Sequence, residues 1–242
     1  MPKPASNKPP SPTRESMQEL LPPLRPVKNG DFRSEVSWRI FRIMAEFIDG
    51  FQFLADLKKE VSFFGSARFT EKNPHYQEAL ELARRLGKAG FTIITGGGPG
   101  IMEAANRGAS ETGAESIGLN IQLPKEQRVN KYVKHGIGFH YFFTRKTILS
   151  ASAQAYIFFP GGFGTLDEFF ELVTLIQTKK MERIPIVLVG KDYWGSLLQW
   201  MKLQVDEKHH AIAPEDMNIF QVVQSIDEAY QIILKSKERV YF

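Results

Sequence analysis

Two glycine-rich turns constrain the fold of this chain most strongly, because each follows a strand-like run and opens a helix-like one. The first turn spans residues 96–100 after the apolar run 91–95, and the second spans 160–165 after 155–159. Both runs are β-branched or aromatic and uncharged, as in strands buried on two faces. A helix that starts directly after such a turn points free N–H groups at whatever lies above the sheet. The two turns therefore predict an α/β fold that binds an anion, most simply a phosphate.

The remainder of the chain alternates between strand-like and helix-like segments in the same way. Further strands are expected at residues 61–64, 116–121, 138–143 and 184–189. Helices are expected at residues 74–89, 100–112, 144–153, 166–179, 194–207 and 225–237. Strands separated by helices of this length predict a single Rossmann-like, doubly wound parallel sheet flanked by helices.

The first 58 residues depart from that alternation. Residues 1–30 are rich in proline, lysine, serine and asparagine, which predicts a disordered lead. Residues 31–58 repeat apolar side chains every three to four positions, which predicts an extra N-terminal amphipathic helix that Gly50 could break. This helix is expected to pack on the main core, and burial against a second copy of the chain in a homodimer is the alternative. Residues 59–242 then form a Rossmann-like nucleotide-binding domain.

Composition excludes several classes of function. The net charge of +4 is spread along the chain, so no nucleic-acid partner is expected. The chain has no cysteine, which excludes disulfides, thiolate nucleophiles and cysteine metal sites, and its 5 histidines are scattered. We therefore expect no metal and no cofactor. No apolar run approaches the length of about 18 residues that a membrane span needs, so a cytoplasmic protein is expected.

Ligands of a doubly wound sheet bind beyond the carboxyl ends of its strands. The loop after the first expected strand, Gly65-Ser66-Ala67-Arg68, offers small residues and a guanidinium that could bind a phosphate, although Arg68 could equally be a solvated loop charge. The turn at 96–100 lacks the Lys-Ser/Thr ending of a P-loop and the spacing of a dinucleotide fingerprint. It therefore argues against an ATPase and against ordinary NAD binding.

The turn at 160–165 leads directly into a pair of acids, Asp167 and Glu168. One interpretation is a capping box, in which Thr165 caps a helix and Glu168 returns the contact. The other places both acids at the mouth of a phosphate-lined cleft, where a carboxylate stabilises a cation or activates water. Upstream, Arg145 and Lys146 begin an expected helix, where cations are unfavourable to the helix dipole, and this favours a ligand role for them.

Four of these segments together resemble the LOG (Lonely Guy) family, whose members are often mislabelled as lysine decarboxylases. The segments are Gly65-Ser66-Ala67-Arg68, residues 96–104, Arg145-Lys146 and residues 160–168, and the likeness spans roughly residues 60 to 190. The resemblance implies hydrolysis of the N-glycosidic bond of nucleoside 5′-monophosphates, including cytokinin nucleotides, to a free base and ribose 5-phosphate. It also implies a dimer.

The resemblance further implies roles for individual residues. Glu168 would be catalytic, stabilising an oxocarbenium-like sugar and orienting water, and Arg145 would bind the substrate and help the base depart. The residues expected to bind an AMP-like substrate are Gly65, Ser66, Arg68, Gly97, Gly98, Gly100, Met102, Glu126, Lys146, Gly161, Gly162, Gly164, Thr165 and Asp167.

Two other functions compete with this hydrolase. A non-catalytic carrier of a nucleotide or of molybdenum cofactor would need the phosphate turns but not Arg145 and Glu168, so that pair favours the enzyme. A pyridoxal-phosphate lysine decarboxylase is disfavoured, because the chain offers no evident second domain to enclose that cofactor. The preferred base stays open, since residues 123–130 and 139–143 resemble a bacterial subgroup and not the plant enzymes.

Overall fold

The computed structural model describes residues 36–122 and 129–238, so the proline-rich lead predicted at 1–30 lies outside the described residues. Its sheet has seven parallel strands in the order β4-β3-β2-β1-β5-β6-β7. The strands are β1 (Glu60–Phe64), β2 (Thr92–Thr95), β3 (Ser116–Ile121), β4 (His135–Phe139), β5 (Ala155–Phe158), β6 (Ile186–Val189) and β7 (Gln221–Val223). The predicted doubly wound parallel sheet is confirmed.

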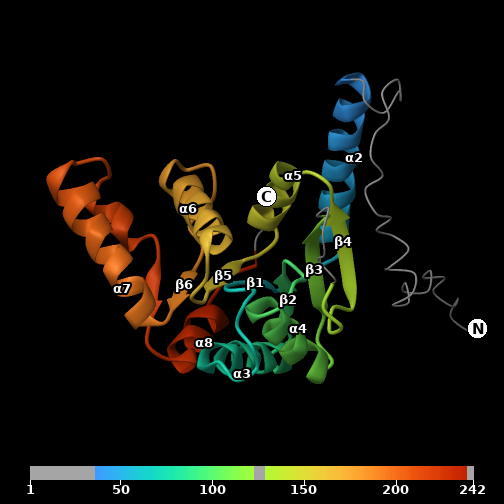
Figure 1. Ribbon diagram of the computed structural model, residues 1–242, viewed down its shortest axis with the longest axis horizontal. Helices are drawn as coiled ribbons and strands as arrows, with labels where there is room; N and C mark the ends of the chain where they lie inside the picture. The colour runs from blue at the N-terminus through green and yellow to red at the C-terminus, as the bar shows by residue number, and fades with distance from the viewer. Residues whose placement is uncertain (1–35, 123–128, 239–242) are drawn as a thin grey trace, which may run out of the picture.

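Helices cover both faces of this sheet (Figure 1). One face carries α3 (Pro74–Lys88), α4 (Ile101–Glu111) and α8 (Ile226–Leu234). The other carries α2 (Val36–Ala55), α5 (Phe142–Ala151), α6 (Phe163–Gln177) and α7 (Lys191–Trp200). Neighbouring strand residues therefore enter opposite cores: Ile93 packs in the α3–α4 layer and Ile94 in the α5–α6 layer. This is why the strands read as unbroken apolar runs.

Several predicted boundaries are wrong. The strand expected at 138–143 is β4, His135–Phe139, and the following helix begins at Phe142 instead of 144. Phe142 and Phe143 resemble a strand in sequence but are 57% and 47% exposed in the first turn of α5. The helix expected at 194–207 is α7 followed by a π-helical segment, Met201–Lys208. Neither the 3-10 turn Pro214–Asn218 nor the edge strand β7 was predicted, because both are very short.

The N-terminal helix α2 is continuous, so the break considered at Gly50 does not occur. Gly50 is buried against α5, where an added Cβ would lie 2.7 Å from Ile148 Cγ1. One side of α2 thus packs on the domain, as one of the two interpretations predicted. Elsewhere along α2, large apolar side chains are exposed: Val36, Trp38, Ile40, Phe41, Met44 and Ile48. Among the described residues, no helix has the length and apolarity to cross a bilayer.

The helices α3 and α4 approach closely because α4 contains small residues. A Cβ on Gly108 of α4 would lie 2.5 Å from the backbone oxygen of Leu80 and 2.8 Å from the Cβ of Ala83, both on α3. A backbone atom cannot move aside as a side-chain tip can. Glycine at 108 therefore sets the distance between the two helices.

We expect Gly108→Ala to lower the free energy of unfolding by about 1–3 kcal/mol, because the added methyl overpacks the interface between α3 and α4. The control is Gly195→Ala in α7, where a Cβ meets no atom within 4 Å. That change should stabilise the protein by roughly 0.5–1 kcal/mol through helix propensity. Urea unfolding of both variants measures the difference, and equal effects would show that the close approach at Gly108 has no energetic weight.

Candidate active site

The candidate site lies where the winding of the sheet reverses. From β1 the chain proceeds outward through β2, β3 and β4, and then crosses back to β5 on the other side of β1. The loops that leave β1 and β5 therefore diverge above the sheet, which is where doubly wound folds bind ligands. The two loops touch at their bases, where Ser66 N donates to Pro160 O at 3.0 Å. A cavity of about 800 Å³ opens above this contact.

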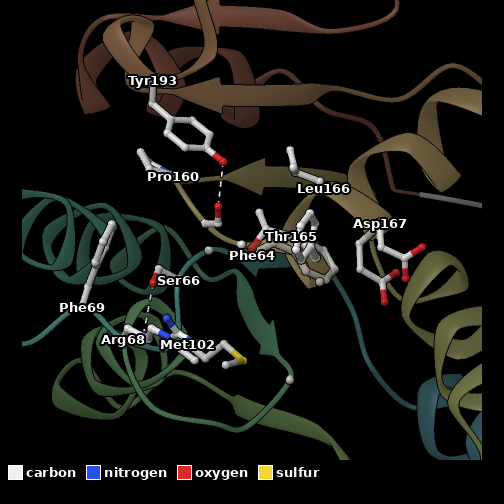
Figure 2. A pocket seen from close by; sticks show the side chains of 18 of the residues that line it. Phe64, Ser66, Arg68, Phe69, Met102, Pro160, Thr165, Leu166, Asp167 and Tyr193 are labelled. Carbon is white, nitrogen blue, oxygen red and sulfur yellow. Dashed lines mark hydrogen bonds between the residues drawn. The ribbon is translucent and has the colours of Figure 1, made fainter. Parts of the chain in front are cut away.

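Residues 65–68 and 96–101 form one interlocked unit, which we call the floor of the cavity. Ile101 N donates to Ser66 O at 3.0 Å, which ties the start of α4 to the β1 loop. Gly100 has φ +71°, and a Cβ there would overlap Ser66 O and lie 2.8 Å from Ala67 Cα. Both the left-handed conformation and the close approach require glycine. Figure 2 shows Ser66, Arg68 and Met102 on this side of the cavity.

A buried polar network supports the floor from behind. Thr95 Oγ1 donates to Asn106 Oδ1 at 2.6 Å and accepts from Gly97 N at 2.9 Å. Asn130 Nδ2 donates to Gly98 O at 2.9 Å and to Asn106 Oδ1 at the same distance. These bonds use backbone groups of Gly97 and Gly98 to shape the turn, and Gly96 is the residue of the turn that lines the cavity.

The second turn forms the opposite wall and corrects one interpretation of the sequence. Helix α6 begins at Phe163 with Gly162 as its N-cap, and Thr165 N donates to Gly162 O at 3.0 Å. The capping-box interpretation of Thr165 and Glu168 is therefore wrong, because both residues lie inside the helix. Tyr193, beyond the neighbouring strand β6, donates its hydroxyl to Gly161 O at 2.6 Å and fixes the turn (Figure 2).

Glu168 is the acid of the cavity that, among the described residues, no ion pair or hydrogen bond engages. Its side chain is buried with the residue only 6% exposed, yet within the described ranges its carboxylate accepts no hydrogen bond. Burial raises the pKa of Glu168 from 4.5 to about 7, against the opposing charges of Lys146 and Arg145 and with help from Glu171. A carboxyl with this pKa can exchange a proton near neutral pH.

Arg145 lies close to Glu168 on the neighbouring helix α5. Its Nε donates to Leu119 O at 2.8 Å, and its guanidinium covers Gly96, where a Cβ would collide with it. Burial lowers the pKa of Arg145, whereas the charge of Glu168 raises it, and the net direction is downward. An arginine stays protonated in this situation, so the site retains a cation facing the Glu168 carboxylate.

Lys146 and Asp167 form an ion pair at the edge of the site. Lys146 Nζ lies 2.6 Å from Asp167 Oδ2 and 3.0 Å from Glu171 Oε2. Burial lowers the pKa of Lys146, but the hydrogen bonds to these two acids outweigh burial and raise it. Lys146 is thus engaged by carboxylates and does not line the cavity, whereas Asp167 does.

The structure brings most of the predicted site residues together. The cavity is lined by Gly65, Ser66, Arg68, Met102, Arg145, Gly161, Gly162, Gly164, Thr165, Asp167 and Glu168. Gly97, Gly98, Gly100 and Lys146 lie behind or beside it, and Glu126 lies outside the described residues. Sequence reasoning missed Phe64, Phe69, Phe142 and Tyr193, and within the motifs it identified it did not single out Ala67, Gly96, Pro160, Phe163 and Leu166. The sequence signal that could have identified Tyr193 is its position just after β6, the strand next to β5.

Within residues 36–122 and 129–238, no three histidine, aspartate or glutamate side chains gather closely enough to hold a metal ion. The lining of the cavity offers carboxylates, arginines and backbone N–H groups.

Known proteins resemble this chain in both sequence and fold. A family model described as "Possible lysine decarboxylase" matches residues 102–233. The cytokinin riboside 5′-monophosphate phosphoribohydrolase LOG7 of Arabidopsis thaliana is 31% identical over 160 residues, covering 62% of this chain and 70% of that protein. The cytokinin riboside 5′-monophosphate phosphoribohydrolase of Mycobacterium tuberculosis is 30% identical over 175 residues, covering 67% and 89%.

The fold is also that of a molybdenum cofactor carrier protein from Chlamydomonas reinhardtii, with a TM-score of 0.56 at 20% identity. That alignment covers 74% of this chain and 97% of the carrier. Arg145 and the turn at 160–165 both fall inside the segment that the family model matches. Because that model covers more than half of the chain and the aligned relatives share about 30% of their residues with it, this protein belongs to the LOG family.

Proposed function

We propose that this protein hydrolyses the N-glycosidic bond of a nucleoside 5′-monophosphate, releasing the free base and ribose 5-phosphate. The observation that carries the proposal is Glu168, a buried carboxylate without a hydrogen-bond donor among the described residues, which faces a cavity shared with Arg145. The relatives from Arabidopsis thaliana and Mycobacterium tuberculosis, which are named as cytokinin riboside 5′-monophosphate phosphoribohydrolases, support it. An intracellular nucleotide as substrate fits the cytoplasmic location expected from the sequence.

The phosphate of the substrate would bind between the two glycine-rich turns. The first N–H groups of α6 have no intrahelical acceptor, and the dipole of that helix is positive at this end. Thr165 adds a hydroxyl and Arg68 a guanidinium, both at the cavity wall. A 5′-phosphate held here directs the ribose toward Glu168, on the second turn of the same helix.

Cleavage of the C–N bond leaves positive charge on the ribose as the base departs. The Glu168 carboxylate would stabilise this charge and take a proton from water as the water oxygen bonds to C1′. The bonding electrons leave with the base, and Arg145 would stabilise the negative charge that develops there. In the part of the chain that the structure describes, no hydrogen bond holds the Glu168 carboxylate, so its oxygens are available to the sugar and to water.

We also propose a homodimer that buries the exposed apolar residues of α2. Val36, Ile40, Phe41, Met44 and Ile48 lie on this helix, and α5, which packs beside it, exposes Phe142 and Phe143. Apolar surface of this extent on a soluble chain indicates a protein interface. An identical copy would present the same apolar residues in return, as two-fold symmetry requires.

Glu168→Gln should lower base release by at least about 100-fold, because the variant keeps the size of the side chain but can neither carry charge nor accept a proton. Free base is measured by chromatography with a panel of nucleoside 5′-monophosphates that includes AMP and a cytokinin nucleotide. Glu207→Gln, an exposed glutamate on the far π-helical segment, is the matched control and should retain activity. A folded wild type that binds these nucleotides without cleaving any would instead support the carrier.

The pH profile tests the state of Glu168. With a pKa of about 7, the carboxylate is the minor form below neutral pH. We therefore expect kcat/KM to rise with pH through about 7 and to be about tenfold lower at pH 6 than on the plateau. A rate that falls as pH rises would mean that Glu168 acts as a protonated acid.

A control variant distinguishes a rise of kcat/KM caused by ionisation of Glu168 from one caused by ionisation of the substrate phosphate. The negative charge of Glu171 helps to raise the pKa of Glu168. Glu171→Gln should therefore move the midpoint of the rise in kcat/KM to lower pH. A rise caused by the substrate phosphate would keep its midpoint in this variant.

Light scattering tests the dimer. We expect the wild type to have twice the chain mass of 27.5 kDa, and the double variant Phe41→Asp/Met44→Asp to be monomeric because it places charge in the apolar surface. Leu203→Asp, at an exposed apolar residue on the distant π-helical segment, is the control and should remain dimeric. A monomeric wild type, or a double variant that remains dimeric, would contradict this interface.

A further inference from the structure

A carboxylate from α2 binds the start of the helix that carries Arg145. Glu46 Oε1 accepts from His140 N at 2.9 Å, and Glu46 Oε2 accepts from Tyr141 N at 3.3 Å. Thr144 Oγ1 lies 2.6 Å from Glu46 Oε2 and can donate to it or to Tyr141 O at 2.8 Å. Three groups around the first turn of α5 thus converge on a single side chain, which comes from 94 residues or more away in the sequence.

Helix α5 needs such a contact because its own residues do not supply one. Its N-cap is Tyr141, whose side chain makes no capping bond, and its first turn contains no acid. Arg145 and Lys146 follow instead, and cations near a helix N-terminus are disfavoured by the dipole. The negative charge of Glu46 offsets both the dipole and these two cations. It supplies from another helix what an N-cap side chain ordinarily supplies locally.

The contact leads through the backbone to the active site. Arg145 N donates to Tyr141 O at 3.3 Å. The backbone of Arg145 is therefore bonded to Tyr141, the residue whose N–H donates to Glu46. The side chain of Arg145 then extends to Leu119 O and covers Gly96. A shift of the first turn of α5 would therefore move the guanidinium relative to Glu168, which stands on a different helix.

We propose that Glu46 is a positioning residue, which fixes the N-terminus of α5 and thereby the guanidinium of Arg145 over the substrate cavity. The proposal rests on the proposed function where it concerns catalysis. It gives α2 a second task besides its expected part in the dimer, because the helix then helps to build the active site of its own chain. Small errors in the placement of a reacting group are costly, and a shift of about 1 Å can slow a reaction by about 100-fold.

The kinetic test compares Glu46→Ala, Glu46→Gln and the control Asp49→Ala, which removes an exposed carboxylate from the same helix. We expect kcat for base release to fall at least about tenfold in Glu46→Ala, with KM changed less than about threefold. Glu46→Gln keeps one acceptor oxygen and should recover part of the loss, and Asp49→Ala should match the wild type. Equal kcat values in Glu46→Ala, Glu46→Gln and Asp49→Ala would overturn the proposal.

A second readout does not depend on activity. The Nε–H of Arg145 donates to Leu119 O, so its NMR signal can be assigned by its loss in Arg145→Lys. This signal should shift or broaden in Glu46→Ala and stay unchanged in Asp49→Ala. If Glu46→Ala does not fold, Glu46→Gln, which preserves the shape of the side chain, decides the question. A wild type that cleaves no nucleotide would reject the proposed function, whereas an unchanged Arg145 signal in both Glu46 variants would reject the positioning role alone.

Discussion

The pairing of β1 with β5 is the contact on which the site depends. Phe64 lies opposite Phe158 in this parallel register, so both strands end at the same level and their glycine turns emerge side by side. Because the winding of the sheet reverses between these strands, the helices that follow them leave toward opposite faces and a space opens above. The floor extends from β1, and α6 with Glu168 extends from β5. A slip of one residue in this pair would displace the two walls of the cavity by roughly 3.3 Å.

The site has an energetic cost that the fold must offset. The pKa of Glu168 rises from 4.5 to about 7 on folding, so the folded state favours the protonated acid. By linkage, the stabilisation that the raised pKa of Glu168 contributes is fully present below pH 4.5 and is lost as pH rises through 7. Above pH 7 the ionised carboxylate costs about 3 kcal/mol, at 1.36 kcal/mol per pKa unit. The apolar cores on both faces of the sheet supply the stability that tolerates this charge.

Local sequence patterns were sufficient to predict the sheet and both glycine turns, because apolar runs and turn residues directly reflect the local backbone conformation. They were insufficient for β4, where Gly136 and Gly138 conceal the strand, and for β7, a three-residue edge strand. The LOG-like motifs predicted a shared site for Arg145 and Glu168, and both side chains line the cavity. The Lys146–Asp167 ion pair, the hydroxyl of Tyr193 on Gly161 and the carboxylate of Glu46 on α5 join distant segments. No local pattern indicates such contacts.

The close packing of Gly100 on the β1 loop restricts substitutions in the floor of the cavity but not at its rim. A substitution in either half of the floor would disturb the other half, since Ser66, Ala67 and Gly100 share one tightly packed space. The aromatic residue Phe163 at the rim obeys no such restriction, since it is 92% exposed. Under the proposed function, descendants of this chain could therefore come to accept different bases by exchanging Phe163, while the two glycine-rich turns and the acid–arginine pair stay as they are.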